Sequence, residues 1–122
     1  MQVPLQIKFR HMERSATIED RVRERCHKLQ RFAEHVIRCR VFIDAPHKQQ
    51  VKTGLYQATI EITLLDEQTG GSCHTEQQHA HQNVDVAIRE VFDAAQHQLE
   101  NYVRQQRAYM KKQVSKPHSR IA

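Results

Sequence analysis

The chain has 122 residues, of which 39% are hydrophobic and 27% are charged, and its formal net charge is +5. This length fits one domain with a single core, and three glycines, three prolines and the lack of a long apolar run exclude collagen-like, low-complexity and membrane-spanning proteins. Because Met1–Arg10 alternates apolar and polar residues, we expect no signal peptide and a cytoplasmic protein.

The positive charge is spread unevenly along the chain. Residues 1–60 carry 12 Lys/Arg and 6 Asp/Glu, residues 61–100 carry 1 and 8, and residues 101–122 carry 6 and 0. An acidic segment therefore lies between two basic ones. This asymmetry indicates a polyanionic partner, with nucleic acid the first candidate and an anionic membrane surface the second.

The three cysteines are Cys26, Cys39 and Cys73. An odd number without a CxxC motif argues against a disulfide framework and against a zinc ribbon or finger. We expect reduced and mostly buried thiols.

The first half of the chain predicts a strand, a helix and a second strand. Alternation in Leu5–Arg10 is typical of a half-buried strand. Ser15 is a good N-cap, and apolar residues at steps of three and four predict a helix over residues 16–33. A strand over residues 36–43 should place Ile37 on one face and Val36 on the other, before a long loop over residues 44–54.

The second half predicts a hairpin and a long helix. Strands over residues 55–65 and 73–81 flank a turn at residues 66–72 that contains Gly70 and Gly71. The second of these strands is polar on both faces. Asn83 is a plausible N-cap for a helix that continues to about residue 113.

The order β-α-β-β-β-α predicts an α+β fold: a two-layer sandwich in which two helices cover one face of a four-stranded sheet. The domain should span residues 1–113, with a flexible basic tail over residues 114–122. We expect the other sheet face, with Lys8, Arg10, Arg38, Arg40 and Thr59, to be solvated.

Basic residues at helical spacing form the candidate interface. Arg21, Arg25, Lys28 and Arg31 are spaced by four, three and three residues, so they are neighbours along about three turns. Such a ridge can follow a phosphate backbone, although a solvated helix face with pairs such as Glu24–Lys28 would look the same. The full predicted RNA-binding set is Arg21, Arg25, Lys28, Arg31, Lys48, Lys52, Arg104, Arg107, Lys111 and Lys112.

Neither a metal site nor an active site is indicated. His79, His81 and Cys73 share strand parity and could contribute zinc ligands, but no second ligand pair has metal spacing, so surface histidines are expected. No glycine-rich phosphate loop, GxSxG or HExxH motif is present. We predict no catalytic residue, no metal and no cofactor.

Four stretches in chain order are more specific: Ser15–Ile18 with His27–Phe32; Val41–Asp44; His47–Tyr56 with Ala58–Ile62; and Asn83–Ile88. Together they resemble the bacterial ribosome hibernation factors, also described as ribosome-associated translation inhibitors or ribosomal subunit interface proteins. The resemblance covers about residues 3–113 and implies a fold like a double-stranded-RNA-binding domain. It also implies a short-form member of the family, because the chain ends before the extra domain of longer relatives.

The resemblance implies binding to the small ribosomal subunit and its rRNA in the mRNA/tRNA channel, and therefore inhibition by occlusion. It implies no enzyme activity, no DNA or membrane partner, and a protein that is monomeric off the ribosome. Arg25, Lys28 and Arg31 match basic positions of the family's first helix. The second helix departs from the pattern, because Ala94, His97 and Asn101 stand where Lys or Arg is usual. The alternative is therefore a regulatory protein-interaction module of the same fold with weakened RNA binding.

Overall fold

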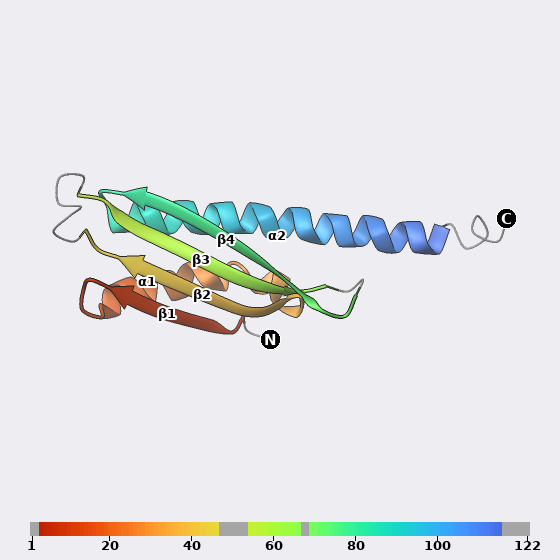
Figure 1. Cartoon of the computed structure of the whole chain (residues 1–122), viewed down its shortest axis with the longest axis horizontal. Helices are drawn as coiled ribbons and strands as arrows, with labels where there is room; N and C mark the ends of the chain where they lie inside the picture. The colour runs from red at the N-terminus through yellow and green to blue at the C-terminus, as the bar shows by residue number, and fades with distance from the viewer. Residues whose placement is uncertain (1–2, 47–53, 67–68, 116–122) are drawn as a thin grey trace.

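The computed structural model describes residues 3–46, 54–66 and 69–115. The elements are β1 (Leu5–Arg10), α1 (Ala16–His27), the short 3-10 helix η1 (Gln30–His35), β2 (Val36–Asp44), β3 (Tyr56–Leu65), β4 (Ser72–His81) and α2 (Val84–Ser115). They form one four-stranded sheet in the order β1-β2-β3-β4, as Figure 1 shows. β1 is parallel to β2, whereas the other neighbours are antiparallel.

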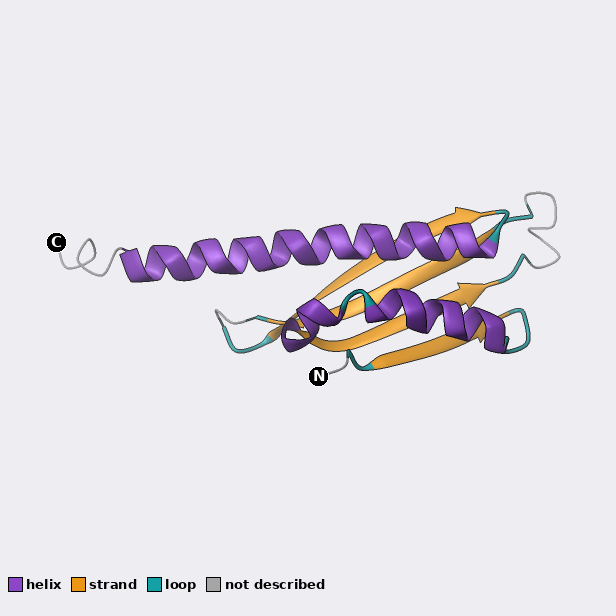
Figure 2. Ribbon diagram, turned by 180° about the vertical axis from the view of Figure 1, so that it is seen from behind, coloured by secondary structure: helices purple, strands orange, loops and turns teal. Residues whose placement is uncertain are grey.

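Both helices lie on the same face of the sheet (Figure 2). α1 contacts β1, α2 contacts β3 and β4, and the two helices contact each other. The two-layer α+β prediction is confirmed. No helix in the described ranges is both long and apolar enough to cross a membrane.

The core lies between the sheet and the helices. Its strand side chains include Val41, Ile60 and Ile62, each at most 2% exposed, and its helix side chains include Val22 and Leu99, both fully buried. Burial of such an aliphatic side chain contributes about 1.5–3 kcal/mol. Packing against the core therefore determines which side of each helix faces solvent.

The helix starts are capped as predicted. The Ile18 amide donates to the Ser15 hydroxyl at 3.3 Å, and the Asp85 amide donates to the Asn83 side-chain oxygen at 2.9 Å. Each bond satisfies one backbone donor that has no partner within the helix. The predicted end of α2 is close to the observed one at Ser115.

The prediction of one helix over residues 16–33 is wrong. α1 ends at His27, and η1 follows at Gln30 and runs directly into β2 at Val36. Leu29 marks the break, with φ −89° and ψ 1°. A 3-10 turn is tighter than an α-helical one, and here it buries Leu29 and Phe32 while the chain reverses into the sheet.

The predicted faces of β2 are wrong at its start. A register irregularity separates Val36 from Arg38, so that Val36 is 7% exposed and Ile37 is 48% exposed. An extra residue in one strand shifts the alternation of side chains. From Cys39 to Ile43 the predicted alternation holds, with Cys39, Val41 and Ile43 in the core.

The open sheet face is less solvated than predicted. Phe42 and Thr59 are only 7% and 8% exposed. The Arg10 and Arg40 guanidinium carbons lie 4.3 and 5.8 Å from the centre of the Phe42 ring. Long basic side chains thus cover an aromatic ring while their charged ends remain at the surface.

β4 forms as predicted despite its polarity. It pairs with β3 from Tyr56↔His81 to Leu65↔Ser72. On the helix side, Thr75 and Gln77 both hydrogen-bond to the side-chain oxygen of Gln98 on α2. Hydrogen bonds to the helix therefore replace part of the apolar contact that a core-facing strand would otherwise make.

Candidate nucleic-acid interface

The predicted basic residues that the structure describes gather where α1 and η1 run beside α2. This side of the molecule faces away from the sheet (Figure 2). Two hollows follow the seam between the helices, and arginines from both helical segments line the larger one. We call this region the helix seam, defined by the lining residues of the two hollows given below.

One end of the helix seam brings Arg21 and Arg25 together. They line a hollow of about 70 Å³ with Glu24, Asp85 and Ile88. The Arg21 Nε lies 3.3 Å from an Asp85 carboxylate oxygen, which ties α1 to the first turn of α2. Arg21 remains half exposed, so its guanidinium can still be approached from solvent.

The other end of the helix seam has a hollow of about 430 Å³. Arg31 Nη2 lies 2.6 Å from a Glu100 carboxylate oxygen, and its guanidinium stacks 4.8 Å from the Phe32 ring centre. Arg104 Nη1 donates to Asn101 at 3.2 Å. The residues that line this hollow are Arg31, Phe32, Glu34, His35, Glu100, Val103, Arg104 and Arg107.

The structure gives less information on the remaining predicted residues. Lys28 is exposed at the C-cap of α1, in sequence between the two ends of the helix seam. Lys48 and Lys52 lie outside the described residues. Lys111 and Lys112 belong to α2, whose helical backbone is described there without its side chains.

Arg89 is a candidate that the sequence analysis missed. It is exposed and follows Asp85 by one helical turn, on the stripe that also holds Glu100 and Arg107. Its signal was hidden because residues 61–100 hold a single basic residue among eight acidic ones. Charge counted over segments cannot show which face of a helix a residue occupies.

The helix seam is not uniformly positive, because acidic residues of α2 hold two of its arginines. Asp85 pairs with Arg21, and Glu100 pairs with Arg31 while lying 3.7 Å from the His97 imidazole. Exposed ion pairs contribute at most about 1 kcal/mol each. A phosphate can therefore compete with the carboxylates for these guanidiniums. Before a phosphate binds, the carboxylates determine where the guanidiniums lie.

Three positions of α2 depart from the basic pattern that the resemblance implies. His97 and Asn101 are exposed and Ala94 is half-buried. None supplies the permanent charge expected at these positions. The positive groups described on α2 are consequently Arg89 and the pair Arg104 and Arg107 near the larger hollow.

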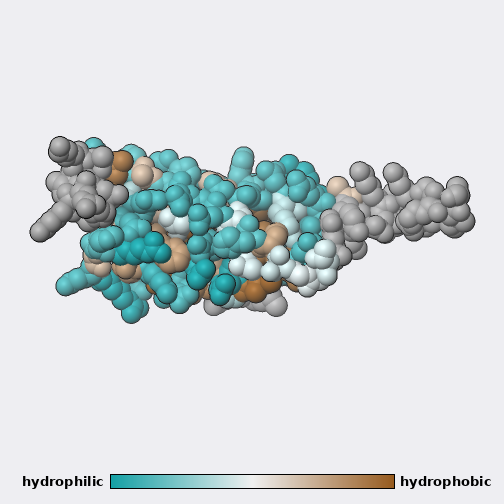
Figure 3. All heavy atoms as spheres, in the orientation of Figure 1, coloured by the Kyte–Doolittle hydropathy of each residue, from teal (hydrophilic) through white to brown (hydrophobic). Residues whose placement is uncertain are grey.

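The open sheet face carries its own cations on the opposite side of the molecule. Figure 3 views this face, which is mainly hydrophilic. Arg10 lies 3.7 Å from Asp44, and Arg40 lies 2.7 Å from Glu61. Lys8 and Arg38 are exposed there, which makes them suitable controls for the helix seam.

The histidines considered as zinc ligands each interact with a different residue. His79 lies 3.6 Å from Glu90, and His81 accepts the Asn83 amide at 2.9 Å. Among the described residues, the donors that could meet at a metal are those of Glu61, His74 and Glu76, which lie within 4.8 Å of one another on the open sheet face. The Glu61 carboxylate, however, already pairs with Arg40.

Comparison with known proteins gives a family and two related folds. The family described as sigma 54 modulation protein / S30EA ribosomal protein matches residues 5–107. A ribosomal subunit interface protein from Coxiella burnetii aligns with a TM-score of 0.63 at 10% identity, over 82% of this chain and 97% of that one. The Protein Y N-terminal domain from Thermus thermophilus aligns with a TM-score of 0.59 at 19% identity, over 84% and 99%. A search of curated protein sequences found no match.

Proposed function

Because the chain belongs to the sigma 54 modulation protein / S30EA ribosomal protein family, we propose that it binds the small ribosomal subunit and inhibits translation. In this proposal the helix seam contacts rRNA in the channel that would otherwise hold mRNA and tRNA. The protein acts by occupying space, without a catalytic step, in the cytoplasm where ribosomes work.

The observation that carries this proposal is the gathering of basic residues from η1 and α2 around one hollow. Arg31 of η1 and Arg104 and Arg107 of α2 line one hollow, although they are far apart in sequence. Positive groups on two neighbouring helical segments can contact phosphates on both sides of a nucleic-acid backbone. Each contact releases condensed counterions, which makes binding favourable at low salt.

The aromatic floor of the larger hollow supports a nucleic-acid partner over a simple anion. Phe32 lies beneath Arg31, and a guanidinium plane held this way can stack on an unpaired base. Single-stranded and looped rRNA offers both phosphates and splayed bases. The site therefore combines charge with a stacking surface.

A salt series with matched variants tests the proposal. Arg25→Ala with Arg107→Ala, one arginine from each hollow of the helix seam, should weaken co-sedimentation with small subunits and reduce the slope of log affinity against log salt by about two units, one per phosphate contact. The control is Lys8→Ala with Arg38→Ala, which removes the same charge from the open sheet face and should leave the slope unchanged.

Equal slopes for the two double variants would contradict a specific role for the helix seam. Binding to large subunits alone would contradict the proposed site. If the protein occupies the channel, mRNA bound to the small subunit should reduce binding of the protein. A competition series with increasing mRNA concentration measures this effect.

A second candidate function is a protein-interaction module that keeps the fold with weakened RNA binding. The observation in its favour is that Asp85 and Glu100 already pair with Arg21 and Arg31. Protein contacts depend far less steeply on salt than phosphate contacts do. Ribosome association that persists at high salt, with both double variants unaffected, would favour this candidate.

A further inference from the structure

Two cysteines that the candidate interface does not use lie against each other inside the molecule. Cys26 comes from α1 and Cys39 from β2, and their thiols share a hydrogen bond. Cys26 is 5% exposed and Cys39 is fully buried. The contact joins the helical layer to the sheet.

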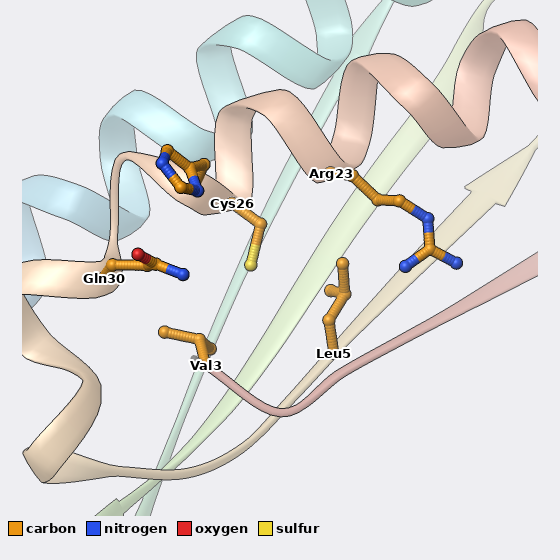
Figure 4. A pocket seen from close by; sticks show the side chains of 6 residues that line it. Val3, Leu5, Arg23, Cys26 and Gln30 are labelled. Atoms are coloured by element: carbon orange, nitrogen blue, oxygen red, sulfur yellow. The ribbon is translucent and has the colours of Figure 1, made fainter. Parts of the chain in front are cut away.

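A hollow of about 240 Å³ between α1 and the edge strand β1 reaches Cys26. Its lining residues are Val3, Leu5, Arg23, Cys26, His27 and Gln30. Figure 4 shows the Cys26 sulfur pointing into this space above Val3 and Leu5, with Arg23 to one side. The hollow greatly exceeds the roughly 30 Å³ that a water molecule occupies, so a molecule as small as hydrogen peroxide can reach the sulfur.

We propose that Cys26 and Cys39 form a reversible disulfide when the protein meets a hydroperoxide, with Cys26 oxidised first and Cys39 resolving. The assignment rests on position: Cys26 lines the hollow, whereas Cys39 lies behind it. It concerns a modification site and does not depend on the proposed ribosome binding.

The first step forms a sulfenic acid. The Cys26 thiolate attacks one peroxide oxygen, a sulfur–oxygen bond forms, the oxygen–oxygen bond breaks, and hydroxide leaves and takes up the proton that the thiol released. In the second step the Cys39 sulfur attacks the Cys26 sulfur. The sulfur–sulfur bond forms, the sulfur–oxygen bond breaks, and hydroxide leaves as water with the Cys39 proton. Two electrons pass from the two sulfurs to the peroxide, and two waters form.

The surroundings of the two thiols suit these roles. The hydrogen bond from Cys39 lowers the pKa of Cys26 against the opposing effect of burial, and the nearby Arg23 charge lowers it further. The Cys39 pKa is raised, mainly by the hydrogen bond to Cys26 together with burial and the Cys26 charge. Oxidation of Cys26 removes that charge, so one cause of the raised Cys39 pKa disappears before the second step.

The test uses the full chain with Cys73→Ser, because Cys73 is exposed and would form bonds between molecules. The reduced protein is treated with hydrogen peroxide and then digested without reductant. We expect loss of both remaining free thiols, one peptide pair linking Cys26 to Cys39, and recovery of both thiols with dithiothreitol. A Cys26 sulfenic or sulfinic acid with Cys39 still free, or two unchanged thiols, would overturn the proposal.

A second variant tests which thiol is oxidised first without changing either buried cysteine. Arg23 is exposed on α1, so Arg23→Gln should fold normally and slow the loss of thiols, and Arg23→Lys should restore the rate. Lys8→Gln, which removes one positive charge at an exposed position away from this hollow, is the matched control. An Arg23→Gln rate equal to that of the control would contradict Cys26 as the thiol that is oxidised first.

Discussion

At the scale of single residues, the acidic partners of the helix seam matter as much as its cations. Glu100 contacts Arg31 at 2.6 Å and also lies near the His97 imidazole. A polyanion that binds Arg31 must replace this contact. The sequence predicted Arg31 as a binding residue, but it could not predict the pairing, because the two residues are 69 positions apart.

Replacement of Glu100 by Gln should therefore strengthen binding to ribosomes. It removes a competing negative charge and leaves the side chain's size almost unchanged. We expect a lower dissociation constant at low salt and a salt slope steeper by about one unit, since Arg31 becomes free to contact a phosphate. Co-sedimentation across a salt series measures both quantities.

Glu13→Gln provides the control for this change. Glu13 is exposed in the connection between β1 and α1, outside the helix seam, and its loss changes net charge equally. An effect of the same size in both variants would assign the gain to net charge alone.

At the scale of elements, β2 shows where periodicity succeeds and where it fails. Alternation correctly predicts Cys39, Val41 and Ile43 in the core. It fails at Val36 and Ile37, because η1 enters the strand directly and the irregularity there shifts the register by one residue. A bulge arises from pairing with β3, which no local pattern in β2 encodes.

The bulge can be tested with two neighbouring truncations. Val36→Ala should lower the free energy of unfolding by about 2 kcal/mol, because it removes two buried methyl groups and leaves a cavity. Ile37→Ala should change it by no more than about 0.5 kcal/mol, as is usual at exposed positions. Urea denaturation measures both values, and a larger loss for Ile37→Ala would contradict the register at the start of β2.

At the scale of the whole molecule, the two faces have different roles. The helices cover one sheet face and present the helix seam, whereas the open face carries Arg40 paired with Glu61 and covers Phe42 with guanidiniums. α2 runs on beyond the end of the sheet (Figure 1). Stability should therefore decrease from the sheet centre toward the end of α2.

Amide hydrogen exchange should follow this gradient. The slowest amides should lie in β2 and β3, which are paired on both sides and hold fully buried side chains such as Val41 and Ile60. The backbone amides of residues 109–115 should exchange much faster, because this part of α2 runs beyond the end of the sheet (Figure 1) and hydrogen bonds at the end of a helix open readily. Equal protection in both regions, measured by mass spectrometry of peptides, would contradict this distribution.

Local chemistry let the sequence predict the element order and both helix caps. Alternation, helical spacing and capping act within a few residues, and a short window of sequence contains them completely. The same holds for the family resemblance, which depends on residue types in chain order.

Contacts between segments that are distant in sequence could be identified only in the folded chain. The ion pairs of Arg21 and Arg31 and the contact of Cys26 with Cys39 join residues of different elements. The end of α1 at His27 was likewise visible only in the folded chain. Such contacts depend on how the two layers pack, because the shared core fixes the rotation and offset of each helix at once. Distances of a few ångströms between side chains follow from that collective arrangement and from no single stretch of sequence.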